Sequence, residues 1–200
     1  MNLWREILLV VLAYLSGSVP FGYILTLRYA GKNILVLGSG NTGSTNVRRI
    51  AGKRIALLTQ TCDMLKGLLP VSLVYILMVY NLCYFEKYFI YLIALATIIG
   101  HDFSVFLRFK GGKGVNTTLG ASLLIAPYSV LISVIIYLVI KWRTKFVSPG
   151  SIGLAISLPI SELIIHGTSL LFYYLLLVSC LIIFMHIPNI QRIIGGNENR

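Results

Sequence analysis

Acidic side chains are scarce in this sequence: it has six of them, against 17 lysines and arginines, in 200 residues. Charged residues of both signs make up only 12% of the chain, which is about half the share typical of a soluble domain. Hydrophobic residues make up 57%. This composition leaves no room for a separate soluble domain and indicates a protein that lies in the membrane.

Motifs that would place the chain in a soluble enzyme class are also missing. The three cysteines show neither metal-ligand nor CxxC spacing, so we expect them to pack as small apolar residues and expect no metal site. The P-loop pattern GxxxxGK[ST] does not occur, because each Gly-Lys pair lacks the glycine five places earlier. The nucleophile elbow GxSxG is absent too, which argues against an acyl-enzyme.

Apolar runs of membrane-spanning size dominate what is present. Several reach the roughly 20 residues that a bilayer core requires, and they are Ile7–Leu27, Ile55–Tyr80, Tyr88–Leu107, Val115–Ile140, Ser151–Ile165 and Thr168–Met185. The first run is too long for the apolar part of a cleavable signal peptide. The sequence therefore predicts an all-α polytopic membrane protein, with residues 1–200 forming a single integral-membrane domain.

Basic residues gather in clusters around residues 28–54, 108–113 and 141–145. The positive-inside rule places such clusters in the cytoplasm. The second and third clusters flank one long apolar run, so they share a side only if Pro127 splits that run into a hairpin of two short helices. A further turn near residues 165–167 completes seven segments, with the N-terminus outside and the C-terminus cytoplasmic.

A glycine-rich stretch, VLGSGNTGSTNVRRI, occupies residues 36–50 and contains GxGxxG from Gly38 to Gly43. Apolar residues precede it, and Asp63 follows about twenty residues later, as in a dinucleotide-binding unit. That unit requires a soluble parallel sheet, and no other convincing strand candidates occur, while Asp63 falls inside an apolar run. We therefore reject the dinucleotide-binding interpretation.

The chemistry of this loop is nevertheless that of an anion site. Glycines let backbone N–H groups approach an anion in a nest, hydroxyl and amide side chains add donors, and Arg48 and Arg49 add charge. A second loop, Phe109-Lys110-Gly111-Gly112-Lys113-Gly114, repeats the combination of glycine and cation. We expect two phosphate-binding loops on one membrane face. The alternatives are a flexible loop and basic residues that only set topology and contact anionic lipid.

Asp63 and Lys66 are charged residues inside an apolar run. They stand three apart on one helix face, so they could simply pair. Because charges inside a membrane are costly, a position lining the functional site is an equally good interpretation.

Three motif blocks resemble the PlsY family of bacterial membrane glycerol-3-phosphate acyltransferases. They run from Ser16 to Arg49, from Gly100 to Val115 and from His186 to Glu198, in family order and at family spacing across essentially the whole chain. The resemblance implies seven membrane helices and a site open to the cytoplasm. It also implies no cofactor and no acyl-enzyme, with a substrate phosphate taking the proton of the attacking hydroxyl; His101, Asp102 and His186 are the alternative bases.

The resemblance also implies site residues, position by position. Those expected to act in catalysis are Ser39, Arg49, Lys113, His186 and Asn189. Those expected to bind substrate are Gly38, Gly40, Asn41, Thr42, Gly43, Thr45, Asn46, His101, Lys110, Gly111, Gly112, Gly114 and Ser151. Glu198 matches a family glutamate that we expect to be structural.

Some positions depart from the family pattern. Asn33 and Leu35 replace an acid and an arginine, and Ser104 replaces a proline. Asn116 stands where a small apolar residue is usual. Ile187 and Pro188 replace polar residues between His186 and Asn189, a change that could alter the spacing of those two side chains in space.

The implied reaction transfers a fatty acyl group from acyl phosphate to the sn-1 hydroxyl of glycerol 3-phosphate, giving 1-acylglycerol 3-phosphate and inorganic phosphate. An acyl-CoA enzyme of the HxxxxD class is disfavoured, because Phe106 stands five places after His101. We expect a monomer in the bacterial inner membrane that contacts lipid and no nucleic acid. The alternatives are a transporter for a phosphorylated solute and a non-catalytic scaffold.

Overall fold

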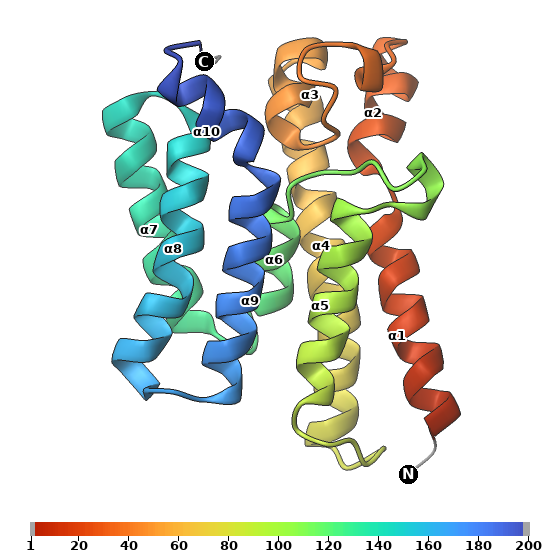
Figure 1. The fold of residues 1–200 in the computed structure, drawn as a ribbon. Helices are drawn as coiled ribbons and strands as arrows, with labels where there is room; N and C mark the ends of the chain where they lie inside the picture. Colours follow the sequence, from red (N-terminus) through yellow and green to blue (C-terminus); the bar gives the residue numbers. More distant parts are fainter. Residues whose placement is uncertain (1–2, 198–200) are drawn as a thin grey trace. The chain divides into compact units, whose positions relative to one another are not determined.

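The computed structural model describes residues 3–197, and within that range every regular element is helical. The chain divides into two compact units, residues 1–124 and residues 125–200, whose helices are labelled in Figure 1. The expectation of an all-helical protein is confirmed. The expectation of one domain over residues 1–200 stays a prediction.

The first unit begins with a broken span. Helix α1 (Leu3–Ser18) and helix α2 (Phe21–Ala30) are separated at Val19 and Pro20, and the 28 residues from Leu3 to Ala30 are together apolar enough to cross a membrane. Proline explains the break, because it has no backbone N–H and clashes with the preceding turn. Helix α2 ends at Ala30 and is capped by Gly31, whose φ of 62° is the left-handed conformation typical of a glycine C-cap.

The glycine stretch connects α2 to a short amphipathic helix. Residues Ile34–Val36 form a 3₁₀ turn, η1, and α3 covers Ser44–Ala51. Ile34 and Val47 are fully buried against Ala56, so the apolar residues before the glycines are used for packing. The strand-like appearance of that run was therefore misleading, and rejecting the dinucleotide-binding unit was correct.

Three more helices complete the first unit: α4 (Lys53–Val79), α5 (Phe89–Asp102) and α6 (Val115–Ser122), with a 3₁₀ turn η2 (Val105–Leu107) after α5. Glycines bring their backbones close. A side chain at Gly17 or Gly100 would overlap the α1–α5 contact, and one at Gly67 or Gly120 would overlap the α4–α6 contact. Small residues are the usual means of close helix packing in membranes.

The second unit consists of α7 (Pro127–Thr144), α8 (Val147–His166), α9 (Leu170–Met185) and α10 (Ile187–Ile194). Glu162 is buried between α7 and α8, where Ser129 donates a hydrogen bond of 2.7 Å to its carboxylate. An acidic residue within a membrane helix is usually buried in this way, paired or hydrogen-bonded to a neighbouring side chain. Further along the chain, the direction changes by 55° between α9 and α10.

Both predicted turns are confirmed. Helix α6 ends at Ser122 and α7 starts at Pro127, which stands in the first helical turn, where its missing N–H costs no hydrogen bond. Helix α8 ends at His166, and α9 starts at Leu170. We expected both helices of this pair to be short. Helix α6 is short, with eight residues, but α7 has 18 residues and is long enough to span a membrane. Within residues 3–197, five helical segments have the length and composition of a span, or six if α9 and α10 count as one.

Candidate functional site

Asn46, in the first turn of α3, organises the first glycine loop. It is 2% exposed, and its side-chain oxygen accepts a hydrogen bond of 3.1 Å from the Ser39 N–H. Its side-chain nitrogen donates to the carbonyl oxygens of Leu37, at 3.1 Å, and Asn41, at 3.0 Å. One buried amide therefore holds three points of the loop, which the sequence does not reveal because all three partners are backbone atoms.

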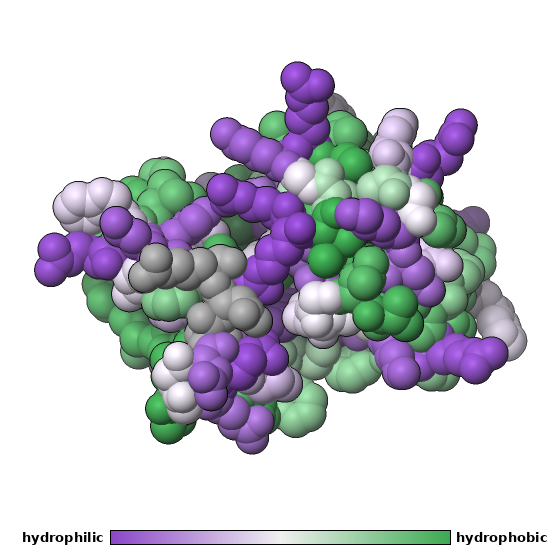
Figure 2. Space-filling model, turned by 90° about the horizontal axis from the view of Figure 1, so that it is seen from above, coloured by the Kyte–Doolittle hydropathy of each residue, from purple (hydrophilic) through white to green (hydrophobic). Residues whose placement is uncertain are grey.

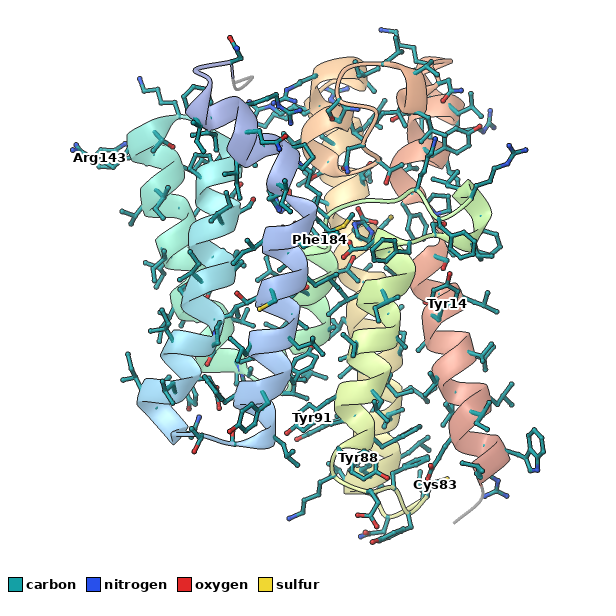
Figure 3. All side chains as sticks on the ribbon, in the orientation of Figure 1. Tyr14, Cys83, Tyr88, Tyr91, Arg143 and Phe184 are labelled. Atoms are coloured by element: carbon teal, nitrogen blue, oxygen red, sulfur yellow. The ribbon has the colours of Figure 1, made fainter. Side chains whose placement is uncertain are left out.

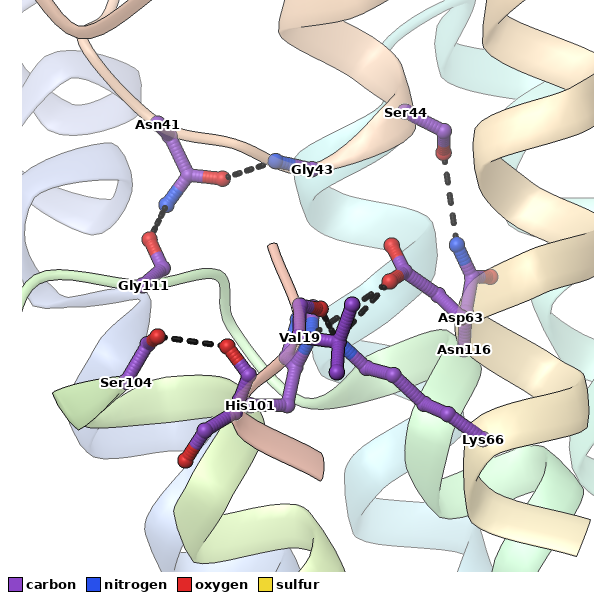
Figure 4. Close-up of polar contacts among 11 residues, drawn as sticks. Val19, Asn41, Gly43, Ser44, Asp63, Lys66, His101, Ser104, Gly111 and Asn116 are labelled. Carbon is purple, nitrogen blue, oxygen red and sulfur yellow. Dashed lines mark hydrogen bonds and ion pairs between the residues drawn. The ribbon is translucent and has the colours of Figure 1, made fainter. Parts of the chain in front are cut away.

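Two side-chain amides join the first loop to the second. Asn41 Nδ2 donates to the carbonyl oxygen of Gly111 at 3.3 Å, and Asn41 Oδ1 accepts from the Gly43 N–H at 2.8 Å (Figure 4). Asn116 Nδ2, near the start of α6, donates to Ser44 Oγ at the start of α3, also at 3.3 Å. The two glycine loops expected from the sequence are thus brought together.

The second loop is pressed against the end of α5. The Gly112 N–H donates to the His101 carbonyl oxygen at 3.0 Å. A Cβ at Gly111 would overlap the carbonyl oxygens of His101 and Asp102, and a Cβ at Gly112 would overlap the His101 imidazole. Arg108 and Phe109 adopt positive φ angles of 53° and 62° to turn the chain here. Glycine is therefore required at two consecutive positions before Lys113.

Helices α3 and α6 both begin immediately after a glycine, Gly43 and Gly114. Glycine offers no side chain to cap the first N–H groups of a helix, and such N-termini carry partial positive charge that attracts anions. The Ser44–Asn116 hydrogen bond places the two N-termini next to each other. Their first N–H groups and the hydroxyl groups of Ser44 and Thr45 are the donors available for an anion.

Three backbone N–H groups of the first loop, where an anion-binding nest was expected, are already hydrogen-bonded within the protein. The N–H groups of Ser39 and Gly43 donate to asparagine side chains, and that of Gly40 donates to the Leu37 carbonyl oxygen. They are used to fold the loop itself. These three N–H groups are therefore not available to an anion.

A buried charged cluster lies where α4 and α5 meet. Lys66 Nζ is 3.0 Å from Asp63 Oδ1 and donates to the Val19 carbonyl oxygen at 2.8 Å (Figure 4). His101 Nδ1 lies 3.6 Å from the same carboxylate oxygen. The predicted Asp63–Lys66 pair is confirmed, and the proximity of His101 is additional. Asp102, also buried, has no hydrogen-bond partner for either carboxylate oxygen within the described part of the chain.

Two further contacts fix the loop after α5 to α1. Ser104 donates to the Ser18 carbonyl oxygen at 2.5 Å, and Tyr14 donates to the Phe103 carbonyl oxygen at 2.9 Å (Tyr14 is labelled in Figure 3). The family resemblance led us to expect a proline at position 104, and the Ser104 hydroxyl makes a hydrogen bond that a proline could not. Sequence reasoning noted the replacement but could not find its partner 86 residues away.

The predicted residues of the first unit differ in exposure. Gly38, Ser39, Arg49 and Lys110 are exposed, whereas Thr42, Asn46, His101, Gly112 and Gly114 are buried. Gly40, Asn41, Gly43, Thr45, Gly111 and Lys113 are intermediate. Figure 2 looks onto the end of the molecule that carries α2 and α3, and hydrophilic side chains project from it. The exposed basic residues near these two helices are Arg28, Lys32, Arg48, Arg49, Lys53 and Arg54.

The remaining predicted residues belong to the second unit. His186 and Asn189 are 3% and 5% exposed. His186 Nδ1 contacts the Ile182 carbonyl oxygen at 2.8 Å, and Asn189 donates to Ser148 Oγ at 2.8 Å. Ser151 is buried one turn after Ser148 on α8. Pro188 stands in the first turn of α10, and the Asn189 N–H donates to the His186 carbonyl oxygen. The chain between His186 and Asn189 therefore forms a helical turn although Ile187 and Pro188 stand where the resemblance led us to expect polar residues.

Sequence reasoning missed Ser148 and the Ser44–Asn116 contact. The available signal for Ser148 was its position before Pro149 at a helix start, but nothing local pointed to Asn189. Glu198 lies outside the described residues.

Together the helical spans and the joined glycine loops define a polytopic membrane protein with a polar site suited to anions. The family model described as "Glycerol-3-phosphate acyltransferase" matches residues 7–196. Two crystal structures of PlsY, an integral membrane glycerol 3-phosphate acyltransferase, superpose with TM-scores of 0.88 and 0.85. They are 33% and 32% identical and cover 98% of this chain and 95% of theirs; one is the glycerol 3-phosphate form and the other the lysophosphatidic acid form.

Curated relatives agree. A glycerol-3-phosphate acyltransferase of Clostridium acetobutylicum is 39% identical over 193 residues, covering 96% of this chain and 98% of the relative. One of Geotalea daltonii is 40% identical over 196 residues, covering 97% and 96%. The chain belongs to the glycerol-3-phosphate acyltransferase family, also known as the PlsY family, and is an integral membrane protein whose role in phospholipid synthesis follows from the family.

Proposed function

We propose that this chain transfers a fatty acyl group from acyl phosphate to the sn-1 hydroxyl of glycerol 3-phosphate. The products are 1-acyl-sn-glycerol 3-phosphate, or lysophosphatidic acid, and inorganic phosphate. The observation that carries the proposal is the pair of glycine loops joined by Asn41–Gly111 and Asn116–Ser44. This arrangement gathers the N-termini of two helices, of which α3 carries Arg49 and α6 directly follows Lys113, in a family whose solved members include a glycerol 3-phosphate form.

Phosphate groups fit these surroundings. A helix N-terminus binds phosphate through its unpaired N–H groups and its dipole, and α3 and α6 supply two such ends. Arginine binds phosphate oxygens in a bidentate fork, whereas lysine acts as a point charge. We propose that Arg49 and Lys113 neutralise the phosphates. Ser39 and the remaining predicted residues of the two loops hold and orient them.

The reaction needs no acyl-enzyme, because acyl phosphate is already activated. The sn-1 hydroxyl oxygen attacks the acyl carbonyl carbon, the bond from that carbon to the bridging phosphate oxygen breaks, and inorganic phosphate leaves. A phosphate oxygen of a substrate takes the hydroxyl proton. The enzyme contributes positioning and charge neutralisation, which account for a large part of many enzymatic barriers. We propose Ser151, His186 and Asn189 as further site residues on the basis of the family resemblance.

We further propose that the chain forms one domain with seven membrane segments, its N-terminus outside and its C-terminus in the cytoplasm. Two observations support this topology. Basic residues gather near α2 and α3. The chain also breaks between α6 and α7, where a turn is needed if the basic clusters at 108–113 and 141–145 are to lie on the same side of the membrane. The proposed location is the bacterial inner membrane, with the site facing the cytoplasm and the protein acting as a monomer in contact with lipids.

Substitution at the two cations separates this proposal from its alternatives. Arg49→Ala and Lys113→Ala should each abolish acyl transfer, while Arg54→Ala, which also removes one exposed positive charge, should retain most of it. The measurement is acylglycerol phosphate formed by purified protein, with phosphate-solute uptake into proteoliposomes in parallel. If the wild type shows no acyl transfer and the variants lose phosphate-solute uptake, a transporter is favoured. If the substitutions change neither acyl transfer nor uptake, a scaffold is favoured.

A further inference from the structure

Asp63 and Lys66 form an ion pair that the acyl transfer described above does not use. Both lie on α4 inside a span, with 2% and 5% exposure, and their charged atoms are 3.0 Å apart. Charged residues at such positions are costly and are usually retained for a function. Replacement of a buried ion pair by uncharged residues of similar volume is often neutral or stabilising, so stability alone is weak grounds for keeping it.

Each partner of this pair also contacts a different segment of the first unit. Lys66 Nζ donates to the Val19 carbonyl oxygen at 2.8 Å, in the break between α1 and α2, and lies 5.8 Å from the centre of the Phe21 ring. Asp63 Oδ1 lies 3.6 Å from His101 Nδ1 at the end of α5. The pair thus connects the break in the first span to His101.

His101 in turn contacts the second glycine loop through both its backbone and its side chain. Its carbonyl oxygen accepts the Gly112 N–H at 3.0 Å, and its imidazole occupies the space that a Cβ of Gly112 would need. The imidazole therefore packs directly against Gly112, so a rotation of the ring would change the contact made with Gly112, the residue before Lys113. A carboxylate beside Nδ1 limits such rotation and favours the tautomer with its proton on Nδ1.

We propose that Asp63 and Lys66 are positioning residues, which act through His101 to hold the Gly111–Lys113 loop in the place where it binds a substrate phosphate. The part of this proposal that concerns the phosphate rests on the proposed function. The part that concerns the loop does not, because it predicts loop order without any substrate.

The test uses the full-length double variant Asp63→Asn/Lys66→Met, which removes both charges while keeping the side-chain sizes. Because no unpaired charge remains, it should fold with a melting temperature near that of the wild type in detergent. We expect backbone amides of residues 109–114 to exchange hydrogen at least tenfold faster than in the wild type. We also expect KM for glycerol 3-phosphate to rise at least tenfold, with a smaller change in kcat.

Glu162→Gln is the matched control, since it neutralises another buried acid, which bonds Ser129 and His166 in the second unit. It should leave both exchange at residues 109–114 and KM unchanged. If the double variant does not fold, Asp63→Glu replaces it: this keeps the charge, shifts the carboxylate relative to His101, and should raise both exchange and KM.

A folded variant with wild-type exchange at residues 109–114 and wild-type KM would overturn the proposal. Faster exchange spread evenly over the helices of the first unit would also overturn it, because that pattern indicates general destabilisation. If the wild type itself forms no acylglycerol phosphate, the proposed function fails, and the exchange comparison still decides whether the pair positions the loop.

Discussion

Asn41 and Gly111, 70 residues apart in the sequence, are joined by a hydrogen bond of 3.3 Å from the side-chain nitrogen of Asn41 to the carbonyl oxygen of Gly111. The other atom of the same amide, Oδ1, accepts the N–H of Gly43 at 2.8 Å. One planar group thus sets the distance between the loop before α3 and the loop before α6.

Asn41→Asp should weaken substrate binding. The aspartate can still accept from Gly43, but it would place an oxygen against the Gly111 carbonyl oxygen and a negative charge beside the proposed phosphate site. We expect KM for glycerol 3-phosphate to rise about tenfold or more, a cost of at least about 1.4 kcal/mol. Asn33→Asp is the control: it adds the same charge at an exposed position whose side chain accepts from the Leu35 N–H at 3.0 Å. Equal KM values for the two variants would contradict the link.

Asn46→Ala should destabilise the first loop. The substitution leaves one N–H and two carbonyl groups without the partner they have now. Unmade hydrogen bonds of buried groups cost about 1–3 kcal/mol each, so a total of about 2–4 kcal/mol is expected after partial access of water. The measurement is thermal unfolding in detergent, beside the exposed control Asn197→Ala. An unchanged melting temperature would show that the loop holds its shape by other contacts.

Gly112→Ala should disable the second loop. Its methyl group would overlap the His101 imidazole, so either the ring or the loop must move, and Lys113 moves with it. Misplacement of a binding group by about 1 Å can cost about 100-fold in rate. We expect a loss of that order in kcat/KM. Gly195→Ala, where the nearest atom is 3.4 Å from the added methyl group and φ is −79°, should behave like the wild type.

Asn116→Ala should have a small and specific effect. It restores a residue of the type usual in the family and removes only the 3.3 Å bond to Ser44. A partly buried hydrogen bond is worth about 1 kcal/mol, so KM for glycerol 3-phosphate should rise about fivefold. The double variant Ser44→Ala/Asn116→Ala should be no worse than the more affected single variant. Strictly additive effects would mean that the two side chains act independently.

The parts of the fold that local patterns determine could be predicted from the sequence. The long apolar runs predicted membrane helices, and Pro127 and Gly167 stand where the predicted turns occur. The Asp63–Lys66 pair follows from helical spacing alone. The apolar run before Gly38 was harder to assign, because four residues suit a strand as well as a buried 3₁₀ turn, and only packing against Val47 and Ala56 decides between them.

The detailed site could not be predicted, because its contacts join residues far apart in the chain. Nothing in the local pattern of Asn41 indicates Gly111, and nothing near Ser104 indicates the Ser18 carbonyl oxygen. Glycine-rich composition indicated backbone N–H groups free for an anion, yet the N–H groups of Ser39 and Gly43 bond asparagine side chains. Composition shows which donors exist, whereas only the folded chain shows which of them are already used.

Acyl transfer from acyl phosphate can be measured directly in one assay. Purified protein in detergent is given glycerol 3-phosphate with either palmitoyl phosphate or palmitoyl-CoA, and acylglycerol phosphate and inorganic phosphate are followed together. We expect equal amounts of acylglycerol phosphate and inorganic phosphate from palmitoyl phosphate, no acylglycerol phosphate from palmitoyl-CoA, and none from either donor with Lys113→Ala. Product from palmitoyl-CoA alone, or no product from either donor with folded wild-type protein, would contradict this expectation.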